Sequence, residues 1–363
     1  MTTRRMGSNS EAEPTRSFSL IVPMRNEEHY IEETLNSLIA QDYPAGMFEI
    51  LVVDGRSTDA SRDIVNRLAA AHSSIRVLHN PRVIPAAARN VGVKAARGRF
   101  IGIVDCHSYV QPDFLATAER LFAETGADCL GRPVELFIAT DSYVQRVIGA
   151  ARTSWLGHNL VSPRYRDVRG ATSPLSVGIL YRREVFDHIG LFDESLGACE
   201  DVELNSRLEQ ADLTTWTDPA LMAYYHPRGS LWGLFKQMGR YAYWRYRLLR
   251  EHRKAFHLTQ AAPAIAVVLG IASLTGMPLG LSAVAPLALA AAYVAVILVA
   301  SVRASAARGF RYLPALPLAY AAIHFGAAVG FWVGVVEGIG QSVVRAAGAL
   351  GRRFRASRAP SPE

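Results

Sequence analysis

The residues most able to do chemistry lie in one short stretch, Asp105-Cys106-His107. They follow residues 98–104, an apolar run that predicts a buried strand. A strand buried on both faces has little use for a carboxylate or an imidazole, so these side chains belong just beyond its C-terminal end. Ligands bind at that edge of open α/β sheets, and Asp105 and His107 can both reach one divalent cation. The stretch therefore predicts a site for a metal–diphosphate complex, with capping of a turn as the alternative.

Polar side chains also follow the first two predicted strands. Asn26 and Glu27 come after the apolar run 18–23, and Asp54 comes directly after the run 48–53. Carboxylates at two adjacent strand ends suit hydrogen bonds to the ribose hydroxyls or the base edge of a nucleotide. The turn chemistry of an Asp followed by Gly explains the second carboxylate equally well. These residues predict a nucleotide pocket, with an ordinary turn at Asp54 as the alternative.

Two further groups add charge to this picture. Arg89 lies on the predicted helix 86–96, where it could meet a diphosphate. Glu200, Asp201 and Glu203 crowd the first turn of a later predicted helix, where the helix dipole favours carboxylates. Acids this close together also raise one another's pKa values, which is how a general base is tuned. The cluster predicts a catalytic base, with simple stabilisation of the helix dipole as the alternative.

Strands and helices alternate four times within about 110 residues of the front part of the chain. This pattern favours an α/β fold with a parallel, doubly wound sheet and right-handed crossovers. No Gly-x-Gly-x-x-Gly follows the first strand and no Walker motif occurs, which excludes the usual dinucleotide-binding and NTPase folds. The predicted strands are 18–23, 48–53, 75–78, 98–104 and 175–181. The helices for which the pattern predicts both ends are 29–40, 86–96 and 112–124.

Composition places this front part in the cytoplasm. Residues 1–17 are polar and lack the apolar core of a signal peptide, so they predict a disordered leader and a front domain that is not exported. The three cysteines, Cys106, Cys129 and Cys199, are widely spaced and form no Cys-x-x-Cys. That spacing argues against a zinc site or a disulfide framework and favours reduced thiols.

Charge divides the chain unevenly. Residues 1–257 carry 31 Lys and Arg against 30 Asp and Glu, and residues 258–302 carry none of the four, so the net charge of +7 lies almost entirely in the C-terminal part. A neutral front domain argues against nucleic-acid binding, and a basic tail is typical of a membrane-proximal segment. Residues 231–250 alternate aromatic and basic side chains, which predicts an interfacial helix on a membrane surface.

Three stretches are long and apolar enough to cross a bilayer, namely 261–279, 282–302 and 313–336. Arginines between the second and third stretches mark that loop as cytoplasmic, which agrees with two spans after a cytoplasmic front domain. A single third span would place the basic tail outside, against the positive-inside rule. Either residues 313–344 fold back as a hairpin or re-entrant pair, giving a fourth crossing, or the rule is broken here.

Over residues 18–250 the chain resembles the family 2 glycosyltransferases. The resemblance rests on five motifs in order: Val22-Pro23-Met24-Arg25-Asn26-Glu27, Val53-Asp54-Gly55-x-Ser57-x-Asp59, Ala88-Arg89-Asn90-x-Gly92, Asp105-x-His107 and Glu200-Asp201. The Asp-Cys-His form, residues 181–186 and the membrane tail are most similar to the succinoglycan-type glucosyltransferases. The resemblance implies a GT-A fold, a nucleotide-diphospho-sugar donor with a UDP-sugar expected, Mg²⁺ or Mn²⁺, and inversion at the anomeric carbon.

Carried over motif by motif, the resemblance also implies a site. The residues that would bind the nucleotide-sugar are Pro23, Asn26, Glu27, Asp54, Ser57, Arg89 and Asn90. Asp105 and His107 replace the family's Asp-x-Asp as metal ligands, and Asp201 would be the catalytic base, with Glu200 as the alternative. The acceptor and membrane interface would comprise Gln237, Arg240, Tyr241 and Trp244. Tyr241 stands where the processive synthases of the family have Trp, which favours transfer of a single hexose.

The chain is thus expected to be a membrane-anchored inverting glycosyltransferase of the inner (plasma) membrane, multi-pass, with a cytoplasmic catalytic domain. Its expected partners are a polyprenyl-linked or glycan acceptor, membrane lipid and polysaccharide-assembly proteins, and no nucleic acid. The alternative is a catalytically inactive membrane scaffold or sugar-binding subunit. The expected divisions are a leader 1–17, a GT-A domain 18–230, an interfacial helix 231–257, a transmembrane region 258–344 and a basic tail 345–363.

Overall fold

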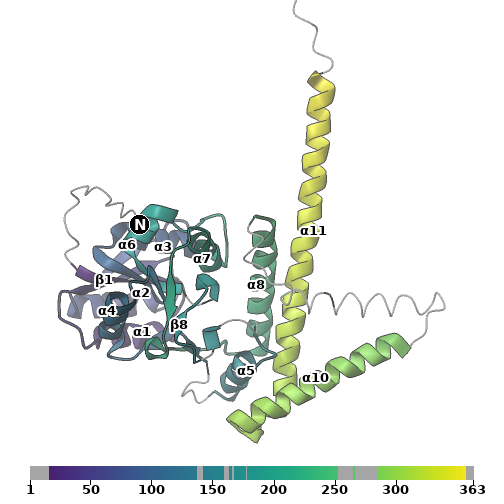
Figure 1. The fold of residues 1–363 in the computed structure, drawn as a ribbon, viewed down its shortest axis with the longest axis horizontal. Coiled ribbons are helices and arrows are strands. Elements are labelled where there is room, and N and C mark those ends of the chain that lie inside the picture. Colours follow the sequence, from purple (N-terminus) through teal and green to yellow (C-terminus); the bar gives the residue numbers. More distant parts are fainter. Residues whose placement is uncertain are drawn as a thin grey trace, which may run out of the picture.

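The computed structural model describes residues 16–136, 142–158, 163–165, 167–176, 178–251, 265 and 284–356. They form an α/β part around a central sheet and a group of long helices beside it (Figure 1). The helices beside the α/β part are α5 (Tyr143–Thr153), α8 (Leu231–Glu251), α10 (Val284–Arg308) and α11 (Leu316–Ala356). α5 is not among the helices predicted from the sequence.

The central sheet has eight strands among the described residues, in the order β3-β2-β1-β4-β9-β6-β10-β8. Its strands are β1 (Arg16–Met24), β2 (Phe48–Asp54), β3 (Ile75–His79), β4 (Gly98–Ile103), β6 (Cys129–Gly131), β8 (Gly170–Ala171), β9 (Gly178–Arg182) and β10 (Thr215–Thr217). The first four strands run parallel, and β9 runs antiparallel to both β4 and β6. The predicted mostly parallel α/β fold is confirmed.

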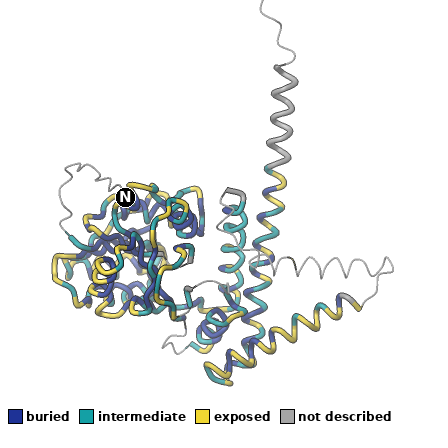
Figure 2. Tube along the Cα trace, viewed as in Figure 1, coloured by how far each residue is buried: buried dark blue, intermediate teal, exposed yellow. Residues whose placement is uncertain are grey.

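Helices cover both faces of this sheet because successive side chains of a strand point to opposite faces. In β1, Leu20 and Val22 belong to one core cluster and Ile21 belongs to the other. The first cluster includes residues of α1 (Ile31–Ile39), α2 (Ser61–Ala71) and α4 (Phe114–Thr125). The second includes residues of α3 (Pro85–Ala95), α6 (Arg183–Ile189) and α7 (Glu200–Gln210). Figure 2 shows the buried residues concentrated in this three-layer part.

A second, three-stranded sheet extends from the end of β4. Its order is β5-β11-β7, with β5 at Ser108–Val110, β11 at Ala223–Tyr225 and β7 at Val134–Glu135. The residues between β4 and β5 are therefore held by a sheet on either side. Single helical turns complete the described elements: η1 (Pro163–Tyr165), η2 (Pro174–Ser176), η3 (Pro219–Leu221) and η7 (Phe310–Tyr312).

α8 lies along α11 through close contacts at Gly239, Gly326 and Gly330, which we call the glycine seam. A Cβ atom on Gly326 would lie 2.5 Å from the carbonyl oxygen of Phe235, and one on Gly330 would lie 1.9 Å from that of Gly239. Glycine alone lets two helix backbones approach this closely. α8, predicted to lie on the membrane surface, is thus fixed against a second helix along its length (Figure 1).

α10 and α11 contain the two helices, within the described ranges, that are long and apolar enough to cross a membrane: Pro286–Arg308 and Leu316–Gln341. They correspond to the predicted second and third spans. The predicted first span, 261–279, lies outside the described residues except for Ile265. The hairpin considered for residues 313–344 is wrong, because α11 is one continuous helix of 41 residues. No proline interrupts the sequence between Pro317 and the end of α11, so nothing in it forces a turn.

Candidate active site

A cavity of about 770 Å³ opens at the carboxyl edge of the parallel strands. Met24 at the end of β1 is the register partner of Asp54 at the end of β2, and Ile103 ends β4 beside Ile21. Because parallel strands end at the same edge, the loops that follow them face one space. The other walls come from α7, α8 and α11, so the cavity lies between the α/β part and the helices beside it.

The loops after β1 and β2 are joined by hydrogen bonds between residues predicted to bind the nucleotide. The backbone N–H of Asn26 donates to Ser57 Oγ at 3.0 Å, and Asn26 Oδ1 accepts from the N–H of Thr58 at 2.8 Å. Asp54 Oδ1 in turn accepts from the N–H of Ser57 at 3.0 Å. Asn26 and Ser57 thus fix the shape of the loops, and neither lines the cavity.

Other predicted nucleotide residues do face the cavity or its edge. Pro23 and Glu27 line it, together with Gly55 of the second loop. Asp54 is buried, and its Oδ2 atom has no hydrogen-bond partner within the part of the chain that the structure describes. An unsatisfied buried acceptor next to a cavity is available to a donor group on a ligand.

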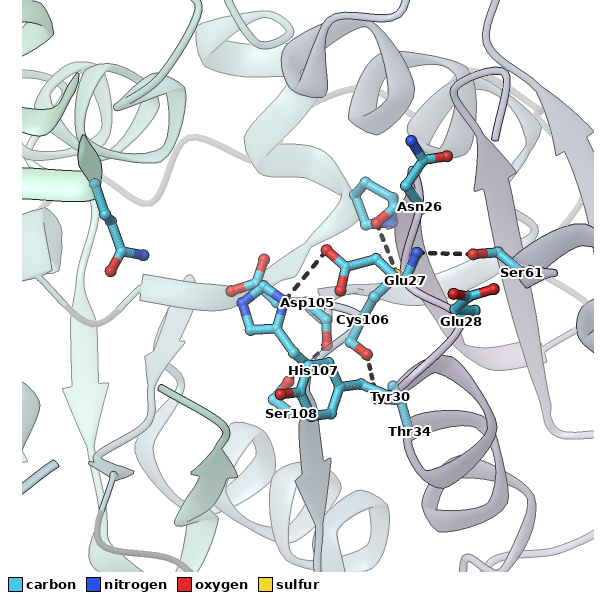
Figure 3. Close-up of polar contacts among 12 residues, drawn as sticks. Asn26, Glu27, Glu28, Tyr30, Thr34, Ser61, Asp105, Cys106, His107 and Ser108 are labelled. Carbon is cyan, nitrogen blue, oxygen red and sulfur yellow. Dashed lines mark hydrogen bonds and ion pairs between the residues drawn. The ribbon is translucent and has the colours of Figure 1, made fainter. Parts of the chain in front are cut away.

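The segment Asp105-Cys106-His107 is pinned from both sides at its centre (Figure 3). Cys106 Sγ donates to the carbonyl oxygen of Pro23 at 2.9 Å, and the carbonyl oxygen of Cys106 accepts from Thr34 Oγ1 at 2.7 Å. Burial raises the pKa of the Cys106 thiol, which keeps it protonated as a donor. With the middle residue fixed in the core, Asp105 and His107 on either side are directed into the cavity.

His107 and Glu27 point toward one another across the cavity wall (Figure 3). The distance from His107 Nδ1 to Glu27 Oε1 is 3.6 Å, and the imidazole packs edge-on against the ring of Tyr225 with centroids 4.4 Å apart. Glu27 and His107 come from β1 and β4 ends that are adjacent in the sheet. The structure therefore brings together two of the predicted site residues through the parallel register.

Arg89 joins the segment Asp105-Cys106-His107 to the acids of α7. Its guanidinium lies 2.8 Å from Glu200 Oε1 and 3.7 Å from Asp105 Oδ1. Burial opposes the charge of Asp105, but His107 and Arg89 outweigh it and hold the pKa of Asp105 below its ordinary value. Burial raises the pKa of Glu200 even though Arg89 opposes this. One buried cation thus connects both carboxylates that the sequence singled out.

Asn90, the neighbour of Arg89 on α3, faces away from this group. Its Nδ2 atom donates to the carbonyl oxygen of Phe192 at 2.9 Å and to Glu194 Oε1 at 2.8 Å, and its Oδ1 atom accepts from the N–H of Phe192 at 2.9 Å. Asn90 therefore holds the segment before α7 in place and does not line the cavity.

The three acids of α7 diverge from one another. Glu200 pairs with Arg89, and Glu203 pairs with Arg207 at 2.7 Å one turn later on the same helix. Asp201 lines the cavity and forms no ion pair within the described ranges. The helix begins directly after Cys199, whose positive φ of 65° turns the chain so that both Glu200 and Asp201 meet the cavity.

The four predicted interface residues of α8 divide into two pairs. Arg240 and Tyr241 line the cavity. Gln237 is buried and donates to the Tyr241 hydroxyl at 3.2 Å, so it orients the residue that replaces the family's Trp. Trp244 packs on Gly197, where a Cβ atom would lie 2.7 Å from the indole ring. Gln237 and Trp244 thus hold neighbouring residues in place, whereas Arg240 and Tyr241 can contact a ligand in the cavity.

Sequence reasoning missed a set of arginines on the cavity wall. They come from α5, η1, the segment before α8 and α8 itself, and are Arg152, Arg164, Arg228 and Arg245. Arg245 falls within the aromatic and basic stretch 231–250, which predicted a membrane-surface helix and not a cavity wall, and Arg152, Arg164 and Arg228 belong to none of the motifs singled out. Folding alone brings them together.

Comparison with known proteins decides the family. Residues 19–190 match the family described as glycosyl transferase family 2. The succinoglycan biosynthesis protein ExoA of Rhizobium meliloti (strain 1021) is 33% identical over 261 residues, which cover 70% of this chain and 77% of that protein. The chain belongs to glycosyltransferase family 2.

A second relative and one solved structure are also similar to the chain. The dolichyl N-acetyl-alpha-D-glucosaminyl phosphate 3-beta-D-2,3-diacetamido-2,3-dideoxy-beta-D-glucuronosyltransferase of Methanococcus voltae is 27% identical over 60% of this chain and 70% of its own. The mannosyltransferase PcManGT from Pyrobaculum calidifontis, solved in complex with GDP-Man and Mn²⁺, is 20% identical and gives a TM-score of 0.56 over 90% of this chain and 91% of its own. The glycosyltransferase therefore has the GT-A fold predicted from its motifs.

Proposed function

We propose that this glycosyltransferase moves a hexose from a nucleotide-diphospho-sugar to a lipid-linked acceptor at a membrane surface, with inversion at the anomeric carbon. One observation carries the proposal: a single cavity is lined by Glu27 and Asp105 at the strand ends, by Asp201 on α7, and by residues of α8 and α11. The names of the two relatives, one in succinoglycan biosynthesis and one acting on a dolichyl-linked sugar phosphate, support an acceptor of this kind.

The donor nucleotide fits the side of the cavity formed by the β1 and β2 loops. Pro23 and Gly55 offer backbone and apolar surface there, and the buried Oδ2 atom of Asp54 lacks a hydrogen-bond donor within the described part of the chain. A base edge or a ribose hydroxyl supplies such a donor. Arg89 lines the same cavity and lies 3.7 Å from Asp105, so it could meet the diphosphate. We expect a UDP-sugar, in line with the family resemblance.

Asp105 and His107 are the residues that would hold Mg²⁺ or Mn²⁺. In the described residues no group of three or more His, Cys, Asp or Glu side chains could hold a metal ion. That fits a cation that takes most of its ligands from the substrate, since Mg²⁺ is usually bound by one or two carboxylates together with phosphates and water. The lowered pKa of Asp105 keeps its carboxylate ionised for this task. When bound, the cation offsets the negative charge of the departing diphosphate.

Asp201 is the residue best placed to act as the base. Glu200 is held by Arg89 and Glu203 by Arg207, so both have other partners. Asp201 lines the cavity and is free of ion pairs among the described residues, so its carboxylate can accept the proton of an acceptor hydroxyl. It enters the cavity from α7, whereas Asp105 enters from the end of β4. Inversion requires that the acceptor attack from the side opposite the leaving group. A base on α7 and a metal ligand after β4 are compatible with this arrangement.

Membrane attachment is supported by α10 and α11. α10 exposes several large apolar side chains, among them Leu287, Val294, Leu298 and Val302. We propose that the protein is a multi-pass protein of the inner (plasma) membrane with its catalytic part in the cytoplasm. There it would take a polyprenyl-linked acceptor and work beside other polysaccharide-assembly proteins.

The full-length protein in membranes, supplied with radiolabelled nucleotide-sugars and lipid-linked acceptors, tests the proposal. We expect Asp201→Asn to bind the donor but to transfer sugar at least about 100-fold more slowly, because the base is lost. Asp187→Asn, an exposed Asp on α6, is the matched control and should transfer normally. Normal turnover by Asp201→Asn would exclude it as the base, and a wild-type protein that consumes no nucleotide-sugar would favour an inactive scaffold.

A further inference from the structure

Four arginines that the proposed transfer step does not use gather around Tyr165 and Tyr225. They are Arg132 after β6, Arg152 in the last turn of α5, Arg164 in η1 and Arg228 shortly before α8. Three of them line the main cavity, and Arg132 lines a space of about 40 Å³ beside it. That small space shares Arg89, Asp105 and Asp201 with the main cavity, so the arginines adjoin the catalytic residues.

Two of the four are buried with unused donors. Arg152 is 9% exposed; its Nη2 atom donates to the Tyr165 hydroxyl at 2.9 Å, and its Nη1 atom has no hydrogen-bond partner within the described part of the chain. Arg132 is 4% exposed, and its Nε and Nη1 atoms are likewise unpartnered among the described residues. Buried guanidinium groups are normally paired with an anion, since an uncompensated buried charge is costly. Among the described residues, Arg132 and Arg152 therefore each lack a paired anion.

Among the residues that the structure describes, no carboxylate forms an ion pair with Arg132 or Arg152. Burial raises the pKa of the Tyr225 phenol, which keeps it neutral. Burial would also raise the pKa of the Tyr165 phenol, but Arg152 and Arg164 lower it below its ordinary value. Asp105 lies near Arg132 without forming an ion pair with it, and pairs with Arg89 instead. Burial lowers the pKa of Arg132 to about 10, so its charge is still present at neutral pH. Asp201 lies near Arg164, so the four arginines outnumber the two carboxylates close to them, Asp105 and Asp201.

The position of this group points to an amphiphilic ligand. α5, which carries Arg152, packs in one core with α10 and α11, the two helices that could cross a membrane. Across the cavity, Met238 of α8 and Ala327 and Phe331 of α11 present apolar side chains. The cavity that the arginines line thus also offers a ligand the apolar surface of α11 and the carboxylate of Asp201.

We propose that Arg132, Arg152, Arg164 and Arg228 form an anion subsite that binds the diphosphate of a lipid-diphosphate-linked sugar acceptor. The inference rests on the proposed function, because it assigns the acceptor's charged group to a place in the same cavity. The acceptor's diphosphate would thus bind apart from the donor's diphosphate, which Arg89 and the segment Asp105-Cys106-His107 would contact.

Acceptor selectivity of the full-length protein in nanodiscs tests the subsite. We compare a sugar linked to a lipid diphosphate with the same sugar as an uncharged alkyl glycoside. Arg152→Gln should lower the ratio of kcat/KM for the two acceptors about 10- to 100-fold, the range expected for lost hydrogen bonds between charged groups. Arg152→Lys, which keeps the charge, should restore part of the ratio, and Arg120→Gln, an exposed arginine on α4, should leave it unchanged. An equal loss on both acceptors, or a matching rise in the donor KM, would overturn the proposal.

A binding measurement separates the subsite from the transfer reaction itself. With the donor site saturated by UDP, inorganic diphosphate should bind the wild-type protein and bind Arg152→Gln at least about tenfold more weakly. This result would support the subsite even if no tested acceptor received sugar. Equal affinity of the two proteins for inorganic diphosphate would refute it. Binding of the lipid-linked form but not of inorganic diphosphate by the wild type would assign recognition to the lipid and overturn the anion subsite.

Discussion

The indole of Trp244 on α8 lies directly against Gly197, in the segment that leads into α7. The same segment contributes Leu196, Ala198 and Cys199 to a small core with Leu248 of α8. The helix that packs along α11 is therefore also the support on which the start of α7 rests. Through this contact the helices beside the catalytic part set the position of Asp201.

Gly197→Ala should lower kcat about 10- to 100-fold while donor binding stays near normal, because a Cβ atom displaces Trp244 and with it the first turn of α7. Steady-state kinetics and donor titration measure the two effects. Gly229→Ala is the matched control, since no heavy atom lies within 4 Å of the Cβ position there. Equal kcat values for the two variants would contradict a positioning role.

Gly330→Ala should weaken the packing of α8 on α11 and reduce transfer, although alanine favours a helix more than glycine does. The new Cβ atom would lie 1.9 Å from the carbonyl oxygen of Gly239, so the two backbones must separate. Transfer activity and thermal unfolding in nanodiscs report the loss. Gly340→Ala on the same helix has open space around its Cβ and should keep both. Wild-type activity in Gly330→Ala would show that the seam is dispensable.

Arg89→Leu should destabilise the fold by about 3–5 kcal/mol, because it leaves the buried carboxylate of Glu200 without its cation. The double variant Arg89→Leu with Glu200→Leu should recover most of that loss, since it removes both charges. It should still fail to transfer sugar, because Arg89 is also proposed to bind the donor's diphosphate. Chemical denaturation and transfer assays measure the two properties, and a double variant as unstable as the single one would rule out the pair as the cause.

Glu49 makes stability depend on pH. Burial alone would raise the pKa of Glu49, but hydrogen bonds from Ser19, Arg76 and the N–H of Arg97 hold it below the ordinary value of 4.5. A lowered pKa in the folded state stabilises the fold above the unfolded value, and that contribution is lost as pH falls through the folded value.

Glu49→Gln should therefore cost about 2 kcal/mol at pH 7, where the ionised side chain accepts these hydrogen bonds. The difference from the wild type should shrink as pH falls below about 4.5. Denaturation midpoints measured between pH 7 and pH 3 check the slope. A difference that stays constant over this range would show that the charge of Glu49 is not what stabilises the fold.

The sequence allowed prediction of the sheet and of the Asp105 segment because both rest on short-range patterns. Apolar runs of strand length alternate with helical spacing, and the polar residue after each run falls at the carboxyl edge. Asn26, Ser57 and Asn90 were assigned by motif to the nucleotide, whereas in the structure they bond to neighbouring loops. Amide and hydroxyl groups serve a ligand or a backbone equally well, so residue type alone cannot separate the two roles.

Features that depend on distant segments could not be predicted in the same way. Arg132 follows β6, Arg152 lies in α5 and Arg228 precedes α8, so these arginines are far apart in the sequence and come to the main cavity or the small space beside it only in the folded chain. The hairpin considered for residues 313–344 follows from the positive-inside rule. That rule concerns the side of the membrane on which charged loops lie, and it does not determine where a helix ends. The backbone itself, free of proline beyond Pro317, continues as α11.

The glycine seam has a consequence for handling the protein. In this seam backbone packs against backbone, so dispersion forces at close range stabilise it. The transfer of apolar surface from water to hydrocarbon does not contribute to this contact. Extraction from a bilayer replaces one apolar surrounding by another and leaves such a contact unchanged. Detergent-solubilised protein should accordingly retain α8 in its place beside the cavity, and with it the part of the cavity wall that α8 forms.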